Sequence, residues 1–154
     1  MKALIVYAST HHGNTKKVVD SIAQACEVET VDATKVADKD LKEYDLIGIA
    51  SGIYATQFHN SVINFAKKNL PDLSETEPKK KIFYIMTSAM NKDFSKGMTK
   101  ELANKNIEVL GAFSCVGYNT FGPFKLIGGT GKGHPDEKDL ENAVTFYKGI
   151  LGKC

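Results

Sequence analysis

Hydrophobic residues of this chain gather in five short runs, each followed by more polar sequence. The runs are rich in β-branched and aromatic residues, a composition that favours β-strands. The first run is expected to be buried on both faces, as in a parallel sheet, and the third is also expected to be buried, whereas EVETV alternates and is expected to be more exposed. The predicted strands span residues 2–8, 27–31, 46–50, 82–87 and 108–116.

Four further segments repeat apolar residues every three or four positions, which predicts amphipathic helices. The second of these ends before Pro71, and the third contains Gly97, which weakens a helix interior. The apolar positions are Val18, Val19, Ile22, Ala23 and Cys26; Val62, Ile63, Ala66 and Leu70; Met98 and Leu102; and Leu140, Ala143, Val144, Tyr147 and Leu151.

The strands alternate with helices along the whole chain. Parallel strands need such crossover connections, so the pattern predicts an α/β fold with helices on both faces of the sheet. Five strands in 154 residues suit a three-layer, doubly wound parallel sheet of flavodoxin-like order 2-1-3-4-5. With no repeat or linker, residues 1–154 are expected to form one domain.

Composition and charge exclude several classes of protein. The net charge of +2 gives little attraction to nucleic acid or an anionic membrane, and the lysine run within residues 73–81 is interpreted as a solvated edge away from any site. No signal peptide or membrane-spanning run is expected. Because Cys26, Cys115 and Cys154 are far apart and form no Cys-x-x-Cys, neither zinc nor a disulfide framework is expected. The simplest location is the cytoplasm.

The loop after the first predicted strand is the first candidate binding site. In doubly wound sheets, ligands bind outside the carboxyl ends of the strands, where the strand order reverses. This loop also leads into a helix N-terminus, where free amide groups favour an anion. The loop offers hydroxyl donors and a glycine that allows close approach of a ligand. Either Asn14 or Thr15 is expected to cap the helix. The loop has no Lys or Arg before Lys16. A phosphate would therefore be held by neutral donors among Ser9, Thr10, His11, His12, Gly13, Asn14 and Thr15.

The motif from Thr10 to Thr15 resembles the phosphate loop of flavodoxins, which usually reads (Ser/Thr)-x-Thr-Gly-x-Thr. The resemblance covers almost the whole chain, with two departures: His12 stands where threonine is usual, and the stretch from Tyr7 to Thr15 is one residue longer. It implies that the cofactor is FMN. From the residues alone, a polar turn without a ligand is the alternative for this loop, and His11 and His12 either contact phosphate or are simply exposed.

The resemblance also implies that two later loops surround the flavin. The loop after the third predicted strand would cover one face of the ring, with Tyr54 stacking on it or anchoring the core instead; its candidate residues are Ser51, Gly52, Ile53, Tyr54 and Ala55. The loop after the fourth would lie at the polar edge of the flavin with Thr87, Ser88, Ala89 and Met90. Many flavodoxins carry an aromatic residue where Met90 stands. The second face is therefore expected to be open, or covered by the long segment 117–134 through Phe121 and Phe124.

The resemblance implies an electron-transfer protein that passes electrons through non-covalently bound FMN to a redox partner protein or a small electron acceptor. No catalytic residue and no metal are expected. The alternative is an FMN-dependent reductase of quinones or other small acceptors, and a flavodoxin-like scaffold without FMN also stays open. A phospho-receiver domain is excluded, because Ala8-Ser9 and Ala50-Ser51 stand where its acidic residues are needed. The partner, the potentials and the oligomeric state are left open.

Overall fold

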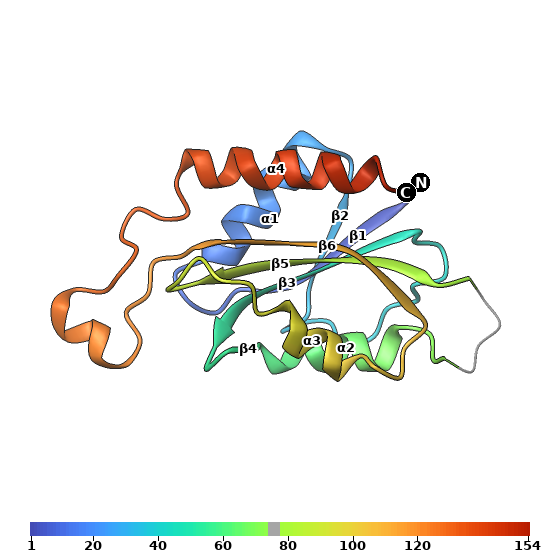
Figure 1. The fold of residues 1–154 in the computed structure, drawn as a ribbon, viewed down its shortest axis with the longest axis horizontal. Coiled ribbons are helices and arrows are strands. Elements are labelled where there is room, and N and C mark those ends of the chain that lie inside the picture. Colours follow the sequence, from blue (N-terminus) through green and yellow to red (C-terminus); the bar gives the residue numbers. More distant parts are fainter. Residues whose placement is uncertain (74–77) are drawn as a thin grey trace.

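The computed structural model describes residues 1–73 and 78–154 and contains the predicted parallel sheet. The strand order is β2-β1-β3-β5-β6, which is the predicted order once the short strand β4 (Gln57–Phe58), paired antiparallel with β3, is left aside. The doubly wound fold is thus confirmed (Figure 1). The parallel strands are β1 (Ala3–Ala8), β2 (Glu29–Asp32), β3 (Leu46–Tyr54), β5 (Lys80–Ser88) and β6 (Ile107–Val116).

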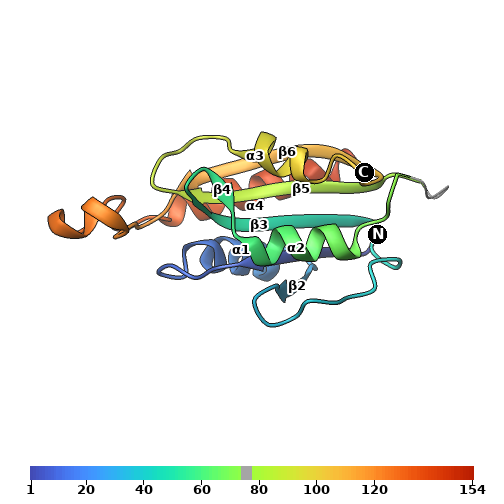
Figure 2. The ribbon, with the colours of Figure 1, turned by 90° about the horizontal axis from the view of Figure 1, so that it is seen from below.

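Helices cover both faces of the sheet. Two helices, α1 (Asn14–Ala25) and α4 (Glu137–Leu151), lie side by side on one face. The other face carries α2 (Asn60–Asn69) and α3 (Ser95–Glu101), as Figures 1 and 2 show. The chain therefore forms three layers, as the alternating pattern predicts.

Alternation along β1 divides the apolar core between these two faces. Leu4 and Val6 pack in the cluster beneath α2 and α3, whereas Ile5 belongs to the cluster beneath α1 and α4. All three side chains are fully buried. Both faces of a central strand in a doubly wound sheet are covered, which explains why this run is continuously apolar.

Three features differ from the sequence-based expectation. The connection between β2 and β3, residues 33–45, contains turns and no helix, although its Leu41 and Tyr44 are buried. The hairpin strand β4 and a short 3-10 helix, η1 (Gly122–Ile127), were not predicted. Within the segment 73–81 that contains the lysine run, residues 74–77 lie outside the described residues, and Lys80 begins β5 at the amino end of that strand. Among the described residues, no helix is long and apolar enough to cross a membrane.

Candidate functional site

A cavity of about 350 Å³ lies at the carboxyl ends of β1, β3 and β5, where ligands bind in doubly wound sheets. The predicted residues that line it are His11, Asn14, Thr15, Gly52, Ile53, Tyr54, Ala55, Thr87, Ser88, Ala89 and Met90. Ser9, Thr10, His12, Gly13 and Ser51 are not among the lining residues. The fold thus brings the three predicted loops to one pocket.

The first loop enters α1 through two residues in the left-handed region, His12 (φ 52°) and Gly13 (φ 67°). Gly13 is the N-cap and gives no side-chain hydrogen bond. The expectation that Asn14 or Thr15 caps the helix is therefore wrong: both are helical, and their side chains bond elsewhere. Instead, Ser9 Oγ accepts a hydrogen bond of 3.1 Å from the Lys16 amide. A left-handed residue next to a right-handed one, as Gly13 is next to helical Asn14, points successive amide groups into a concavity that suits an anion.

Hydroxyl groups of the first loop tie it to the two neighbouring loops. Thr15 Oγ1 and Thr87 Oγ1 share a buried hydrogen bond of 2.8 Å, and the two residues are 1% and 3% exposed. Thr10 Oγ1 and Tyr54 Oη share another, of 2.6 Å. These two bonds fix the first loop against the ends of β5 and β3, so the pocket walls hold one another in place.

Aromatic side chains form the wall on the side of β3. The Tyr54 ring is half-buried, and its centroid lies 5.7 Å from that of His11 and 5.8 Å from that of His59. Gly52 leaves room for this ring, because a β-carbon there would lie 2.9 Å from Tyr54 Oη. Ser51 is fully buried; its hydroxyl donates to the Gly52 carbonyl and accepts from the His59 amide. Its role is to hold the strand end beneath the pocket.

The turn from β3 to β4 places two residues with β-carbons in the left-handed region, Ala55 (φ 47°) and Thr56 (φ 69°). Two-residue hairpin turns of this hand usually carry asparagine, aspartate or glycine, because a β-carbon costs about 1–2 kcal/mol there. Both residues line the pocket. The strain is thus located at the pocket, where the surrounding structure holds it.

The remaining wall comes from the segment after β6. Tyr118, Asn119 and Phe121 line the pocket, whereas Phe124 does not. Asn14 Nδ2 donates to the Tyr118 carbonyl at 2.8 Å, and the Tyr118 and His12 ring centroids are 4.4 Å apart. Sequence reasoning missed Tyr118, although an aromatic residue directly after the last strand was the available signal. Thr56, Gly117 and Asn119 are further lining residues that it did not single out.

The pocket is electrically neutral at its walls. None of its lining residues is Lys, Arg, Asp or Glu within the part of the chain that the structure describes. The first cation after the loop, Lys16, pairs with Asp20 at 2.6 Å on the surface of α1. A ligand in this pocket would therefore meet neutral donors and apolar surface.

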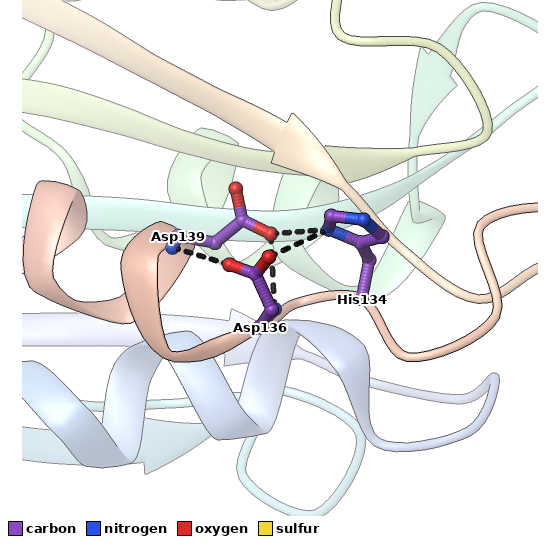
Figure 3. Close-up of side chains that lie close together, drawn as sticks. All are labelled: His134, Asp136 and Asp139. Carbon is purple, nitrogen blue, oxygen red and sulfur yellow. Dashed lines mark hydrogen bonds and ion pairs between the residues drawn. The ribbon is translucent and has the colours of Figure 1, made fainter.

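A second group of titratable side chains lies at the start of α4 (Figure 3). His134 Nδ1 is 2.7 Å from Asp139 Oδ2, and Asp136 and Asp139 form reciprocal hydrogen bonds to each other's amides. The hydrogen bond to Asp139 raises the pKa of His134. Partial burial opposes ionisation of Asp139, but the bonds from His134 and Asp136 outweigh it and lower its pKa.

The ligand-type atoms of these three residues lie within 4.8 Å of one another, yet the hydrogen bonds account for their arrangement as a capping box. Asp136 is the N-cap, so Pro135 directly precedes the cap. The cluster anchors the beginning of α4.

The cysteines take no part in the pocket. Cys115 is buried, and burial raises the pKa of its thiol to about 12, which keeps it neutral and unreactive. Cys26 is half-buried and Cys154 is exposed; all three are free.

The fold and the pocket define a flavodoxin-like α/β protein, and comparison with known proteins places the chain in a family. A family model described as a flavodoxin domain matches residues 4–121. An uncharacterized protein of Methanocaldococcus jannaschii is 41% identical over 154 residues, which cover 98% of this chain and 99% of that protein. The chain therefore belongs to the flavodoxin family.

Solved structures show the same fold at low identity. Oxidised flavodoxin 1 from Bacillus cereus superposes with a TM-score of 0.68 at 15% identity, covering 100% of this chain and 99% of that one. A flavodoxin from the domain Archaea gives 0.67 at 19% identity, with coverages of 99% and 98%. A Lactobacillus acidophilus flavoprotein in complex with FMN gives 0.55 at 17% identity, with coverages of 73% and 92%.

Proposed function

We propose that the protein binds FMN non-covalently and transfers electrons between redox partners. The observation that carries this proposal is the neutral pocket at the strand ends, entered by a loop whose two left-handed residues precede α1. Membership of the flavodoxin family supports it, as does the FMN complex of the similar Lactobacillus flavoprotein.

The donors beside α1 suit the phosphate of this cofactor. A phosphate bound at a helix N-terminus interacts with backbone amides and with the helix dipole, so it needs no lysine. The loop supplies the amides of His12, Gly13 and Thr15 and the hydroxyls of Ser9 and Thr10, whereas the Asn14 amide donates to the His11 carbonyl at 3.3 Å. Bonds that these hydroxyls make within the protein, to Lys16 and Tyr54, are of a kind that a phosphate oxygen can replace or share.

The ribityl chain of FMN, which follows the phosphate, suits the buried side-chain amide of Asn14 in the pocket wall. Asn14 is 7% exposed, and its Oδ1 has no hydrogen-bond partner within the described structure. A buried unpaired acceptor costs about 1–3 kcal/mol, so it is usually explained by a donor that is not yet present. The ribityl chain of FMN carries hydroxyl donors of this kind.

The remaining walls suit an apolar ring system. Ile53, Tyr54, Met90, Phe94 and Phe121 contribute apolar or aromatic surface, against which a flat conjugated ring is held by packing and offset stacking. A flavin bound there supplies the one- and two-electron chemistry. The chain's own residues bind it, orient it and exclude water from the face against Tyr54.

The pocket favours an electron carrier over a reductase of small molecules. Carriers need no residue to move protons on a substrate, and no Asp, Glu, Lys or Cys of the described chain lines this pocket. Its lining histidine, His11, lies against the Tyr54 ring, with centroids 5.7 Å apart. The three free thiols are in keeping with work in a reducing compartment, which we take to be the cytoplasm.

The test is a visible spectrum of purified protein, followed by titration of the cofactor-free protein with FMN. We expect absorbance near about 450 nm, the region of flavin absorption, and quenching of FMN fluorescence on binding. We expect the loaded protein to exchange electrons with redox proteins and not to turn over NAD(P)H with quinones. Sustained turnover would favour the reductase, and absence of FMN binding would leave only a flavodoxin-like scaffold.

A further inference from the structure

We propose that the face around the pocket mouth binds a partner protein that has an apolar recess rimmed by carboxylates. This docking face consists of Met90 on one side of the mouth and of Phe121, Lys125, Leu126, Ile127 and Lys132 in the 117–134 loop. The inference rests on the proposed function, since the partner is the protein with which the bound flavin exchanges electrons.

Large apolar side chains are exposed on this face. Leu126 is 90% exposed and Ile127 72%, both on η1, a helix with no buried residue. Phe121 is 69% exposed and Met90 61%. Apolar residues that gather beside a binding pocket, rather than standing singly, mark an interaction surface.

The 117–134 loop is held in shape although it projects from the body of the protein (Figure 1). Asn119 and Thr130 exchange two backbone hydrogen bonds of 2.8 Å, and the Tyr118 amide donates to the His134 carbonyl at 3.0 Å. Closer to η1, Tyr118 Oη donates to the Gly128 carbonyl at 3.1 Å. These bonds fix the tip before any partner arrives, which reduces the entropy lost on docking.

The charge of the loop selects the kind of partner. Residues 109–135 contain no Asp or Glu, and the loop carries Lys125 and Lys132. In the loop after β5, Lys92 lies over the Phe94 ring and Asp93 accepts a hydrogen bond from the Ser95 amide, so that loop adds one charge of each sign. A cationic rim around apolar residues is complementary to carboxylates around an apolar recess.

Continuity with the pocket indicates a protein partner rather than a lipid surface. Phe121 belongs both to the pocket lining and to the docking face, so a protein seated there lies directly beside a bound flavin. The face is small, as in transient redox complexes, which bury less than about 1,200 Å². Two lysines would give only weak attraction to an anionic membrane.

The test measures electron transfer to the FMN-loaded protein from a reduced, acidic plant-type ferredoxin, by stopped-flow absorbance without oxygen. Each ferredoxin cluster loses one electron, which the bound flavin takes up, and two ferredoxins with protons from water complete the reduction. The wild-type rate should fall as salt rises, because opposite charges attract the two proteins.

Substitutions separate the apolar and cationic parts of the face. The double variant Leu126→Ser/Ile127→Ser should slow the reaction about tenfold, the effect of losing well-packed interface anchors. Lys125→Glu/Lys132→Glu should slow it similarly at low salt and reverse the salt dependence. Leu73→Ser, at a position that is 60% exposed outside this face, should leave the rate unchanged. FMN affinity and oxidation of the reduced protein by ferricyanide should be unchanged in all variants.

Other outcomes overturn the proposal. If the loaded variants react with ferredoxin at the wild-type rate, the docking face is refuted while FMN binding stands. Sedimentation with vesicles containing anionic phosphatidylglycerol, lost in Leu126→Ser/Ile127→Ser while the ferredoxin rates stay equal, would assign the face to a membrane instead. A protein that takes up no FMN overturns the proposed function and the docking face with it.

Discussion

At Gly117 the chain leaves β6 and passes close to Asn14 at the start of α1. Replacing Gly117 with alanine therefore tests how the pocket wall after β6 and the wall formed by the first loop support each other. A β-carbon at this position would lie 2.6 Å from Asn14 Nδ2 and 2.9 Å from Asn14 Cγ. The Asn14 amide cannot simply turn aside, since its Nδ2 donates to the Tyr118 carbonyl at 2.8 Å. Either that hydrogen bond or the position of the loop must change.

The expected cost combines two effects. Overpacking a tight site costs about 1–3 kcal/mol, and loss of the hydrogen bond costs about 1 kcal/mol, so Gly117→Ala should destabilise the protein by about 2–4 kcal/mol. For a chain of this size, that corresponds to a fall in Tm of about 4–16 °C. Because Asn14 begins α1 at the pocket, FMN affinity should fall about tenfold or more.

The assay is urea unfolding of the cofactor-free protein, together with fluorescence titration of FMN. Gly149→Ala is the matched control, because no atom lies within 4 Å of a β-carbon there and the residue is inside α4. That change should stabilise the protein by about 0.5–1 kcal/mol through helix propensity. If Gly117→Ala unfolds within about 0.5 kcal/mol of wild type and binds FMN equally well, the close packing described here is wrong.

Three further outcomes are expected. Thr15→Val breaks the buried bond to Thr87 and should cost about 1–3 kcal/mol of unfolding free energy and most FMN binding, whereas Thr15→Ser should retain both. Thr56 has a left-handed backbone conformation, so Thr56→Gly should remove strain and stabilise the protein by up to about 1 kcal/mol, whereas Thr56→Ala should not. Equal free energies of unfolding for the two variants would argue against strain. The hydrogen bond to Asp139 raises the pKa of His134. The pair therefore contributes fully to the free energy of unfolding below pH about 6.5, and this contribution is lost as pH rises through the raised pKa. The stability difference between wild type and His134→Gln, by urea unfolding, should therefore shrink from pH 5.5 to 8.5, and a constant difference would contradict the pairing.

The centre of the sheet was predictable because most residues of β1, β3 and β5 are buried, on both faces of the sheet. A short, continuous apolar run such as LIVYA in β1 predicts a buried strand. The assignment is clear when the next segment has the spacing of an amphipathic helix. The most exposed strand, β2, was predicted as 27–31 but observed as Glu29–Asp32. It packs on only one neighbour, β1, and the alternation in its sequence does not fix where pairing ends.

The hairpin at the end of β3 could not be predicted from turn signals. Its two turn residues, Ala55 and Thr56, lie in the left-handed region without being glycine or asparagine. The conformation is therefore imposed by pairing of Ile53 with Phe58 and Tyr54 with Gln57. Such conflicts between local preference and observed conformation are expected at functional sites.

The location of the pocket was predictable, whereas the contacts inside it were not. The strand order brings Thr15 and Thr87 to the same edge, but their hydrogen bond depends on how closely the two loops approach. The sequence likewise offered Asn14 as a helix cap, and the structure uses its amide to hold Tyr118, 104 residues away in the chain. Contacts of such long range follow from tertiary packing and not from local pattern.

The central claim is that neutral amides and hydroxyls at the start of α1 hold the phosphate of FMN. Comparing the affinities of the cofactor-free protein for FMN and for riboflavin, which lacks only the phosphate, tests it most directly. We predict that FMN binds at least about 100-fold more tightly, equivalent to about 2.7 kcal/mol, and that the ratio changes little with salt because no cation is involved. Equal affinities for the two flavins would contradict the account.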